Sequence, residues 1–229
     1  MTELKKKGSD SIKKILLNHG AEEPLFGVKV ADLKIIQKKV KKDNELAKEL
    51  YATGNYDAMY LAGLITDDSK LTKKEIQQWA EKSGSKGITE YTVAWVAAES
   101  PYGWELGMEW IDSSKEKIAS AGWNTLSGVI AMKADEELDI ATIKKLLQRI
   151  QKQIHKAQNR VRYTMNGFVI GVGGYIKALT KEAMEVSNKI GVVTVDMGGT
   201  ACKIPLASDY IKKMEASGRL GKKKKTVKC

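Results

Sequence analysis

The apolar residues of this chain recur every three or four positions, the spacing that places them on one face of an α-helix. The clearest stripes lie in 28–40 and 139–154, where charged residues, mostly lysines, separate the apolar positions. Such amphipathic stretches are typical of helices that cover a core on one side and meet water on the other. Further helices are predicted over 46–51, 56–65, 72–80, 89–98, 104–111, 116–132, 160–171, 181–189 and 208–216.

The predicted helices alternate between two kinds. One kind is amphipathic and charged, and the next is compact, with small residues among large apolar ones. Compact segments begin at Tyr60, Thr92, Ala121 and Met165, which lie 32, 29 and 44 residues apart. Repeats of this length are typical of stacked helical pairs, in which each pair buries its apolar face only against a neighbour. The pattern therefore predicts an all-α solenoid of helical pairs, a curved α-α superhelix.

Local signals support these helices. Gly63, Gly122 and Gly167 lie inside compact segments, where glycine costs about 1 kcal/mol relative to alanine, so we expect each to permit close helix packing. Thr72 precedes a predicted helix, and Glu75 three residues later completes a capping box.

Residues 192–200 depart from the helical pattern. Their β-branched start is typical of extended chain, and the paired glycines that follow predict a turn. The sequence Asp196-Met-Gly-Gly-Thr200 resembles the first phosphate loop of actin-like sugar kinases. That motif opens a two-domain α/β fold, and only 29 residues follow it here. We expect instead a loop whose Asp196, Thr200 and Lys203 close one end of the solenoid.

The composition is that of a globular protein, with 42% hydrophobic and 29% charged residues. No apolar run approaches the roughly 20 residues that span a bilayer, and the first 14 residues lack the apolar core of a signal peptide. The two cysteines, Cys202 and Cys229, have no paired spacing, which argues against a disulfide framework or a cysteine zinc site. We therefore expect a cytoplasmic protein with no membrane partner, no metal and no cofactor.

The net charge of +11 suggests a nucleic-acid partner, but it is unevenly distributed. Residues 219–229 hold six cations and no acid, which leaves five of the eleven net charges for residues 1–218. We expect a single domain over 1–215 and a basic, flexible tail over 216–229. Such a tail is either a solvated end or a source of non-specific phosphate affinity.

The best candidate surface for anions is the start of the helix predicted near 160. Asn159, Arg160 and Arg162 stand where unpaired amide groups favour an anion. A guanidinium can hold a phosphate through two parallel hydrogen bonds, and the chain has only four arginines. Lys156 just before them enlarges the cationic surface. Surface salt bridges are the competing interpretation.

Aromatic and acidic side chains supply the remaining candidates. Tryptophans at helical spacing pack in cores more often than they stack on bases, and we expect Trp95 and Phe168 to be the aromatic residues that face a ligand. Glu90 and Tyr91 begin a compact helix after a glycine-rich loop. Glu90 is either a functional carboxylate or a helix-start acid favoured by the macrodipole.

Several segments resemble the AlkD-like DNA alkylation repair family, which is built from HEAT-like repeats. The likeness begins at Pro24-Leu-Phe-Gly-Val-Lys-Val-Ala-Asp-Leu33, continues through 48–51 and 55–65, and extends to about Lys181. Residues 159–168 together with 196–202 resemble a divergent subgroup of this family. The resemblance implies a right-handed HEAT/ARM-like superhelix whose concave face carries cations against the DNA backbone.

In active members of that family, an aspartate, an arginine and two tryptophans surround an alkylated nucleotide. The carboxylate stabilises the cationic sugar that forms as the base leaves. Carried onto this sequence, the aspartate falls near Ala94 and the arginine near Ser120 or Ala121. One tryptophan position falls on Phe168 and the other near Glu90. An alanine cannot stabilise a cation, so the implied chemistry lacks its carboxylate here.

Three functions stay open on the sequence. The first is a monomeric DNA-binding protein that grips duplex, distorted or damaged DNA by its phosphates. The second is an N-glycosylase for alkylated purines, with Glu90 in the vacant catalytic role. The third is a protein-interaction scaffold, which an acidic or apolar concave surface would favour over DNA.

Overall fold

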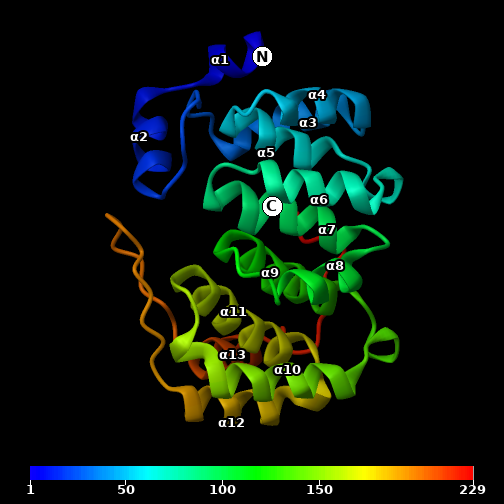
Figure 1. The fold of residues 1–229 in the computed structure, drawn as a ribbon, viewed down its shortest axis with the longest axis vertical. Coiled ribbons are helices and arrows are strands. Elements are labelled where there is room, and N and C mark those ends of the chain that lie inside the picture. Colours follow the sequence, from blue (N-terminus) through cyan, green and yellow to red (C-terminus); the bar gives the residue numbers. More distant parts are fainter. Residues whose placement is uncertain (229) are drawn as a thin grey trace.

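The structure, a computed structural model, describes residues 1–228, which form a solenoid of α-helical pairs with no strand (Figure 1). Helices α1 (Thr2–Lys7), α2 (Asp10–Asn18) and α3 (Val30–Val40) come first. The outer member of each following pair is α4 (Asn44–Ala52), α6 (Lys73–Lys82), α8 (Gly103–Trp110), α10 (Ile140–Gln153) or α12 (Thr180–Ile190). The inner members are α5 (Tyr56–Ile65), α7 (Ala94–Glu99), α9 (Glu116–Met132), α11 (Asn159–Tyr175) and α13 (Ala207–Ala216). The predicted all-α solenoid is confirmed.

Short turns complete the pairs. A π-helical turn, η2 (Ile88–Val93), leads directly into α7. Single 3₁₀ turns are η1 (Asp68–Lys70), η3 (Asp135–Glu137), η4 (Ile154–Lys156) and η5 (Lys177–Leu179). None of the helices in the described part of the chain combines the length and the apolar character that crossing a bilayer requires.

The inner helices stack on one another in sequence order, η2 on α5, α9 on η2 and α7, α11 on α9, and α13 on α11. The compact segments of the sequence therefore form the inner layer. Two of the three glycines make the expected close contacts. A Cβ on Gly63 would lie 2.4 Å from Cγ2 of Thr92, and one on Gly122 would lie 2.7 Å from the amide of Ile111.

Gly167 does not fit that expectation. A Cβ at this position would meet no atom within 4 Å, because the residue borders a cavity on the inner face of α11. The capping box at the start of α6 is confirmed, since Thr72 and Glu75 exchange hydrogen bonds between side chain and backbone.

The hydrophobic core lies between the inner and outer helices along the length of the solenoid. Trp123 and Phe168 are its largest fully buried side chains, and their rings meet edge to face with centroids 5.3 Å apart. Phe168 therefore belongs to the core and does not face a ligand, which corrects the expectation from the sequence. Helical periodicity explains this correction: Gly167, Ile170 and Gly171 lie on the face of α11 that meets the cavity, and Phe168 lies on the other face.

Residues 191–206 form an extended loop without strand pairing. In Figure 1 this orange segment rises along one side of the molecule from α12 towards α2. Asn159 fastens it there, because its side-chain amide donates to the Asp196 carbonyl at 2.8 Å and accepts from the Asp196 amide at 2.7 Å. Gly199 to Cys202 border a cavity with Ile15 and His19 of the α2 region. The loop thus spans a side of the solenoid, whereas the sequence placed it at an end.

Residues 219–228 also differ from expectation. The sequence suggested a flexible tail over 216–229. In the structure, α13 accounts for Ala216, and the described residues beyond Gly218 run back across the inner helices. In Figure 1 the red part of the chain rises from the level of α13 to that of α7.

Candidate nucleic-acid interface

The π-helical turn η2 places Glu90 and Tyr91 on the inner layer. Thr89 fixes the start of this turn, because its buried hydroxyl lies 2.6 Å from the Ser83 hydroxyl and donates to the Ser85 carbonyl at 3.0 Å. Turns of this type are rare, and they occur frequently at functional sites. The backbone carbonyl of Glu90 accepts a hydrogen bond from Asn124 of α9 at 2.8 Å, which joins η2 to the next pair.

The Glu90 carboxylate is paired with a guanidinium from two pairs further along the solenoid. Arg160 of α11 donates from Nε to Oε1 at 2.8 Å and from Nη2 to Oε2 at 2.6 Å. The Glu90 side chain is only 1% exposed, and that of Arg160 is 12% exposed. Two parallel charge-assisted bonds between buried groups hold both side chains in one geometry. Glu90 is therefore not a free carboxylate.

Two tyrosines lie against this pair. The guanidinium carbon of Arg160 stands 4.3 Å from the centroid of the Tyr163 ring, a cation–π contact. The hydroxyls of Tyr91 and Tyr163 are 3.4 Å apart. Burial, and then the neighbouring Tyr163, raise the pKa of Tyr91 above its ordinary value. Burial lowers the pKa of Arg160, but the hydrogen bonds and charge of Glu90 outweigh it and leave a net rise. Both groups keep their protons at neutral pH.

A central cavity of about 290 Å³ opens beside this cluster on the inner face. Four inner helices and residues 219–228 contribute to its wall, which includes four aromatic rings and one lysine: Tyr91, Trp95, Tyr175, Tyr210 and Lys224. Ala94, the position that the family resemblance assigned to the aspartate, also lines it. Among the described residues that line the cavity, Glu90 is the only acid, and it is bound to Arg160.

A smaller side cavity of about 250 Å³ lies on the opposite side of Glu90 and Tyr91. Arg160, His19 and Lys86 contribute cationic or titratable groups to it, and Met197 of the 191–206 loop covers part of it. The Sδ atom of Met197 lies 3.5 Å from Nη1 of Arg160. The cluster around Glu90 is thus the partition between two cavities.

The anion site expected at the start of α11 is already filled by the protein's own groups. The Arg160 amide donates to Oε1 of Glu116 at 2.7 Å, so a carboxylate occupies the position expected for a phosphate. Asn159 binds the 191–206 loop and makes no capping bond. Arg162 lies within 3.5 Å of Asn159 through Nη2, and its buried Nε has no partner.

The other candidates are separated. Trp95 is partly buried and meets the Tyr60 ring edge to face at 5.5 Å, while it lines the central cavity. Lys156 borders an outer groove with Arg149, and Lys203 is exposed on the 191–206 loop. The structure therefore brings Glu90, Tyr91, Trp95 and Arg160 together and leaves Lys156, Lys203 and Phe168 elsewhere.

Sequence reasoning missed several residues of the interface. Tyr163 directly follows Arg162, and its place three residues after Arg160 puts it on the same helical face. Asn124 and Tyr175 carry no local signal, because their role depends on which helices stack. Lys224 stood in a segment that composition assigns to solvent.

Comparison with solved structures supports this architecture. One structure matches with a TM-score of 0.92 and 35% sequence identity, and the match covers 100% of this chain and 97% of the other. It is described as a new family of proteins related to the HEAT-like repeat DNA glycosylases with affinity for branched DNA structures. The fold and its inner cavity thus define a protein of the HEAT-like repeat class.

The particular family follows from the sequence comparison. The family model described as DNA alkylation repair enzyme matches residues 1–190, and this chain belongs to that family. Two uncharacterised relatives, from Listeria monocytogenes and Listeria innocua, are each 34% identical over 218 residues, 93% of this chain and 94% of the relative. The resemblance seen in the sequence is confirmed, and residues 191–228 lie beyond the family match.

Proposed function

We propose that this protein binds branched or distorted DNA across its inner face and does not excise a base. The central cavity carries this proposal: aromatic rings and a lysine surround it, and its one carboxylate is held by Arg160. Aromatic faces stack on bases that are unpaired or splayed apart, as bases are at a branch point. The similarity to a structure described as having affinity for branched DNA supports the same conclusion.

The charges around the cavity favour a phosphate partner. Lys86 borders the side cavity, and Lys224 borders the central one. Contacts of this kind add affinity without reading sequence, and they make binding weaker as salt rises. We include Arg162 and Lys203 as further phosphate contacts at the edge of the interface, and Lys156 as a more distant one.

Catalysis is disfavoured by the environment of Glu90. An excising carboxylate must face the sugar on which positive charge develops. Both carboxylate oxygens of Glu90 accept hydrogen bonds from Arg160, and the side chain is only 1% exposed. Ala94 has no carboxylate that could replace it. Base excision by the wild-type protein that is lost in the Glu90→Gln variant would contradict this part of the proposal.

The test compares a four-way DNA junction with a linear duplex of the same length in gel-shift titrations from 50 to 200 mM salt. We expect tighter binding to the junction and a falling affinity as salt rises. Trp95→Leu should weaken junction binding roughly tenfold if the indole stacks on a base. Trp104→Leu is the matched control, because Trp104 is also partly buried but belongs to the outer helix α8 and does not line the central cavity. Equal binding to both DNAs, or none, would refute the proposal.

We further propose a cytoplasmic monomer. The chain has only two cysteines, and Cys202 is exposed as a free thiol, a state that a reducing compartment preserves. Sedimentation of the purified protein would test the monomeric state.

A further inference from the structure

Residues 219–228, here called the returning segment, cross the inner helices in a regular way. Gly218 and Gly221 have φ angles of 64° and 73°, which turn the chain back after α13. The Gly221 amide then donates to the Gly174 carbonyl of α11 at 2.8 Å, and the Lys224 amide donates to the Ala131 carbonyl of α9 at 2.8 Å.

The next anchor along the segment is on α7, and the last is on α5. The Val227 amide donates to Oε1 of Glu99, the last residue of α7, at 2.9 Å. The Lys228 ammonium donates to the Thr66 carbonyl, just after α5, at 3.1 Å. Backbone anchors at 221, 224 and 227 thus meet three successive helices. Three extended residues span about 10 Å, which is close to the 8–10 Å between packed helices.

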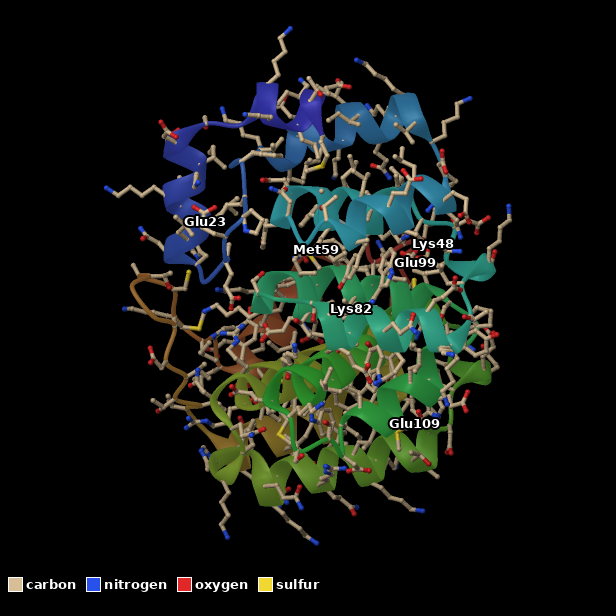
Figure 2. The ribbon with its side chains drawn as sticks, turned by 45° about the horizontal axis from the view of Figure 1, so that its top comes forward. Glu23, Lys48, Met59, Lys82, Glu99 and Glu109 are labelled. Atoms are coloured by element: carbon tan, nitrogen blue, oxygen red, sulfur yellow. The ribbon has the colours of Figure 1, made fainter. Side chains whose placement is uncertain are left out.

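The segment lies along the carboxyl ends of the inner helices, here called the carboxyl edge. Helix ends of this polarity leave unpaired carbonyls and carry partial negative charge. Three acids at or just beyond the ends of α5, α7 and α9 contact the segment: Asp68, Glu99 and Asp135. Figure 2 shows Glu99 inside the outline of the molecule in that view, and its side chain is half-buried. Lys42, 3.9 Å from Asp68, offsets one of these charges, and the remaining acids and helix carbonyls leave the carboxyl edge negative without the segment.

The returning segment binds each of these acids, Asp135 and Asp68 through a lysine ammonium and Glu99 through uncharged donors. Lys223 pairs with Asp135 at 2.8 Å, and Lys228 pairs with Asp68 at 2.6 Å, with both side chains only 6% exposed. Oε1 of Glu99 accepts from the Thr226 hydroxyl and from the amides of residues 227 and 228. The segment is bound here by a matched set of charges, helix carbonyls and hydrogen bonds.

Three lysines of the segment are left for other partners. Lys222, Lys224 and Lys225 are exposed, and no carboxylate of residues 1–228 pairs with them. The Lys224 ammonium stands 5.6 Å from the centroid of the Tyr175 ring, at the central cavity. The segment carries six cations, of which only Lys223 and Lys228 pair with an acid of residues 1–228, so the docked segment reverses the sign of the carboxyl edge.

We propose that the returning segment is a docked cationic strand that converts the negative carboxyl edge of the inner helices into a phosphate-binding side of the central cavity. This inference rests on the proposed function, since it names where the phosphate of that DNA is held. A strand that only blocked the cavity would instead weaken DNA binding.

Docking is tested first, in the full chain and without DNA. Val227→Pro removes the amide that binds Glu99, at a partly buried position on the edge of the core rather than within it, so we expect the helical body to stay folded, which circular dichroism checks. We expect trypsin to cleave between residues 222 and 225 at least tenfold faster in this variant and in Glu99→Ala. Glu105→Ala, on the exposed face of α8, should cleave like the wild type. Equally fast cleavage of the wild-type segment would overturn docking.

The charge of the strand is tested by gel shift with the four-way junction. Replacing Lys222, Lys224 and Lys225 together by Gln keeps the anchors. We expect a loss of affinity of at least tenfold and a salt slope smaller by about 2.7, since each lost contact removes about 0.9. The control replaces exposed lysines on α3 and α10 by Gln: Lys34, Lys38 and Lys145.

The outcomes separate this inference from the proposed function. A wild-type protein without affinity for the junction ends both. Junction binding that is unchanged in the Lys222/Lys224/Lys225 variant, or that loses no more than the control, overturns the inference alone. Tighter binding by that variant or by Val227→Pro also overturns it, because the segment would then be an obstacle to DNA.

Discussion

Glu90 lies in the centre of the inner face, yet its environment is that of a structural side chain. It is 1% exposed, and both of its oxygens accept from Arg160. A buried ion pair adds little net stability, because desolvation offsets the attraction, but removal of one partner leaves an unpaired buried charge. The pair joins η2 to α11 across the intervening α8–α9 pair, so it fixes the geometry of the cavity wall.

Glu90→Gln should lower the free energy of unfolding by about 3–5 kcal/mol, because Arg160 would stay buried without its counter-charge. Urea denaturation followed by circular dichroism measures the change. The double variant Glu90→Leu/Arg160→Met removes both charges and should lose much less. A single-variant loss below about 1 kcal/mol would show that water reaches Arg160.

The contribution of Asp68 to the free energy of unfolding should depend on pH in a direction that its pKa fixes. Burial raises its pKa to about 6, above the ordinary 3.8, although Lys228 and Lys42 oppose the rise and Glu99 supports it. Folding therefore favours the protonated carboxyl. Its stabilising contribution is present below pH 4 and is lost as pH rises through 6.

The Asp68→Asn variant carries no such proton. The unfolding free energy of the wild type, minus that of the variant, should fall between pH 4 and pH 7 by on the order of 3 kcal/mol at most. Urea titrations at several pH values measure this difference. A difference that grows with pH would mean that Lys228 governs the ionisation of Asp68.

At the scale of elements, the inner helices depend on small residues at particular crossings. Gly63 lets α5 approach Thr92, and Gly122 lets α9 approach the end of α8. Gly167 has no neighbour within 4 Å and instead leaves space in the central cavity. The same residue type thus serves packing in two helices and an opening in a third.

Gly63→Ala and Gly167→Ala should change stability in opposite directions. The added methyl at Gly63 meets Thr92 at 2.4 Å, which should cost about 1–3 kcal/mol as overpacking. At Gly167 the methyl meets open space, so the higher helix propensity of alanine should stabilise by about 0.5–1 kcal/mol. Thermal melts of both variants measure the effects. A destabilised Gly167→Ala would mean that the cavity closes in solution.

Elements were predictable from sequence where the signal is local. The bounds predicted for α5 and α9 agree with the structure, and the α6 capping box was read correctly, because periodicity and caps act within a few residues. The face of α11 was misjudged, so that Phe168 was assigned to the cavity instead of Gly167. The pairing of Glu90 with Arg160 was not foreseen, since it depends on stacking between helices 70 residues apart.

At the scale of the whole molecule, two features link pairs that are not neighbours. The Glu90–Arg160 contact skips one pair, and the returning segment touches four inner helices. Solenoids without such links are nearly one-dimensional, and their pairs can unfold separately. Here the links couple distant pairs.

We therefore expect a single cooperative unfolding transition. Urea curves from tryptophan fluorescence and from circular dichroism should coincide for the wild type. In the Glu90→Leu/Arg160→Met variant combined with Val227→Pro, both links are lost, and the two curves should separate. Separate curves for the wild type would indicate that the pairs unfold independently despite these contacts.

The ion pair between Lys228 and Asp68 joins positions 160 residues apart. The curvature of a helical solenoid changes when neighbouring helical pairs slide past one another. An extended segment that is bound to each successive helical pair along one edge fixes the spacing between the pairs. The curvature of the solenoid is therefore set by ten residues of extended chain as well as by helix packing. Inserting a few residues into that segment between two anchors would let the helical pairs move apart along that edge and would widen the concave face.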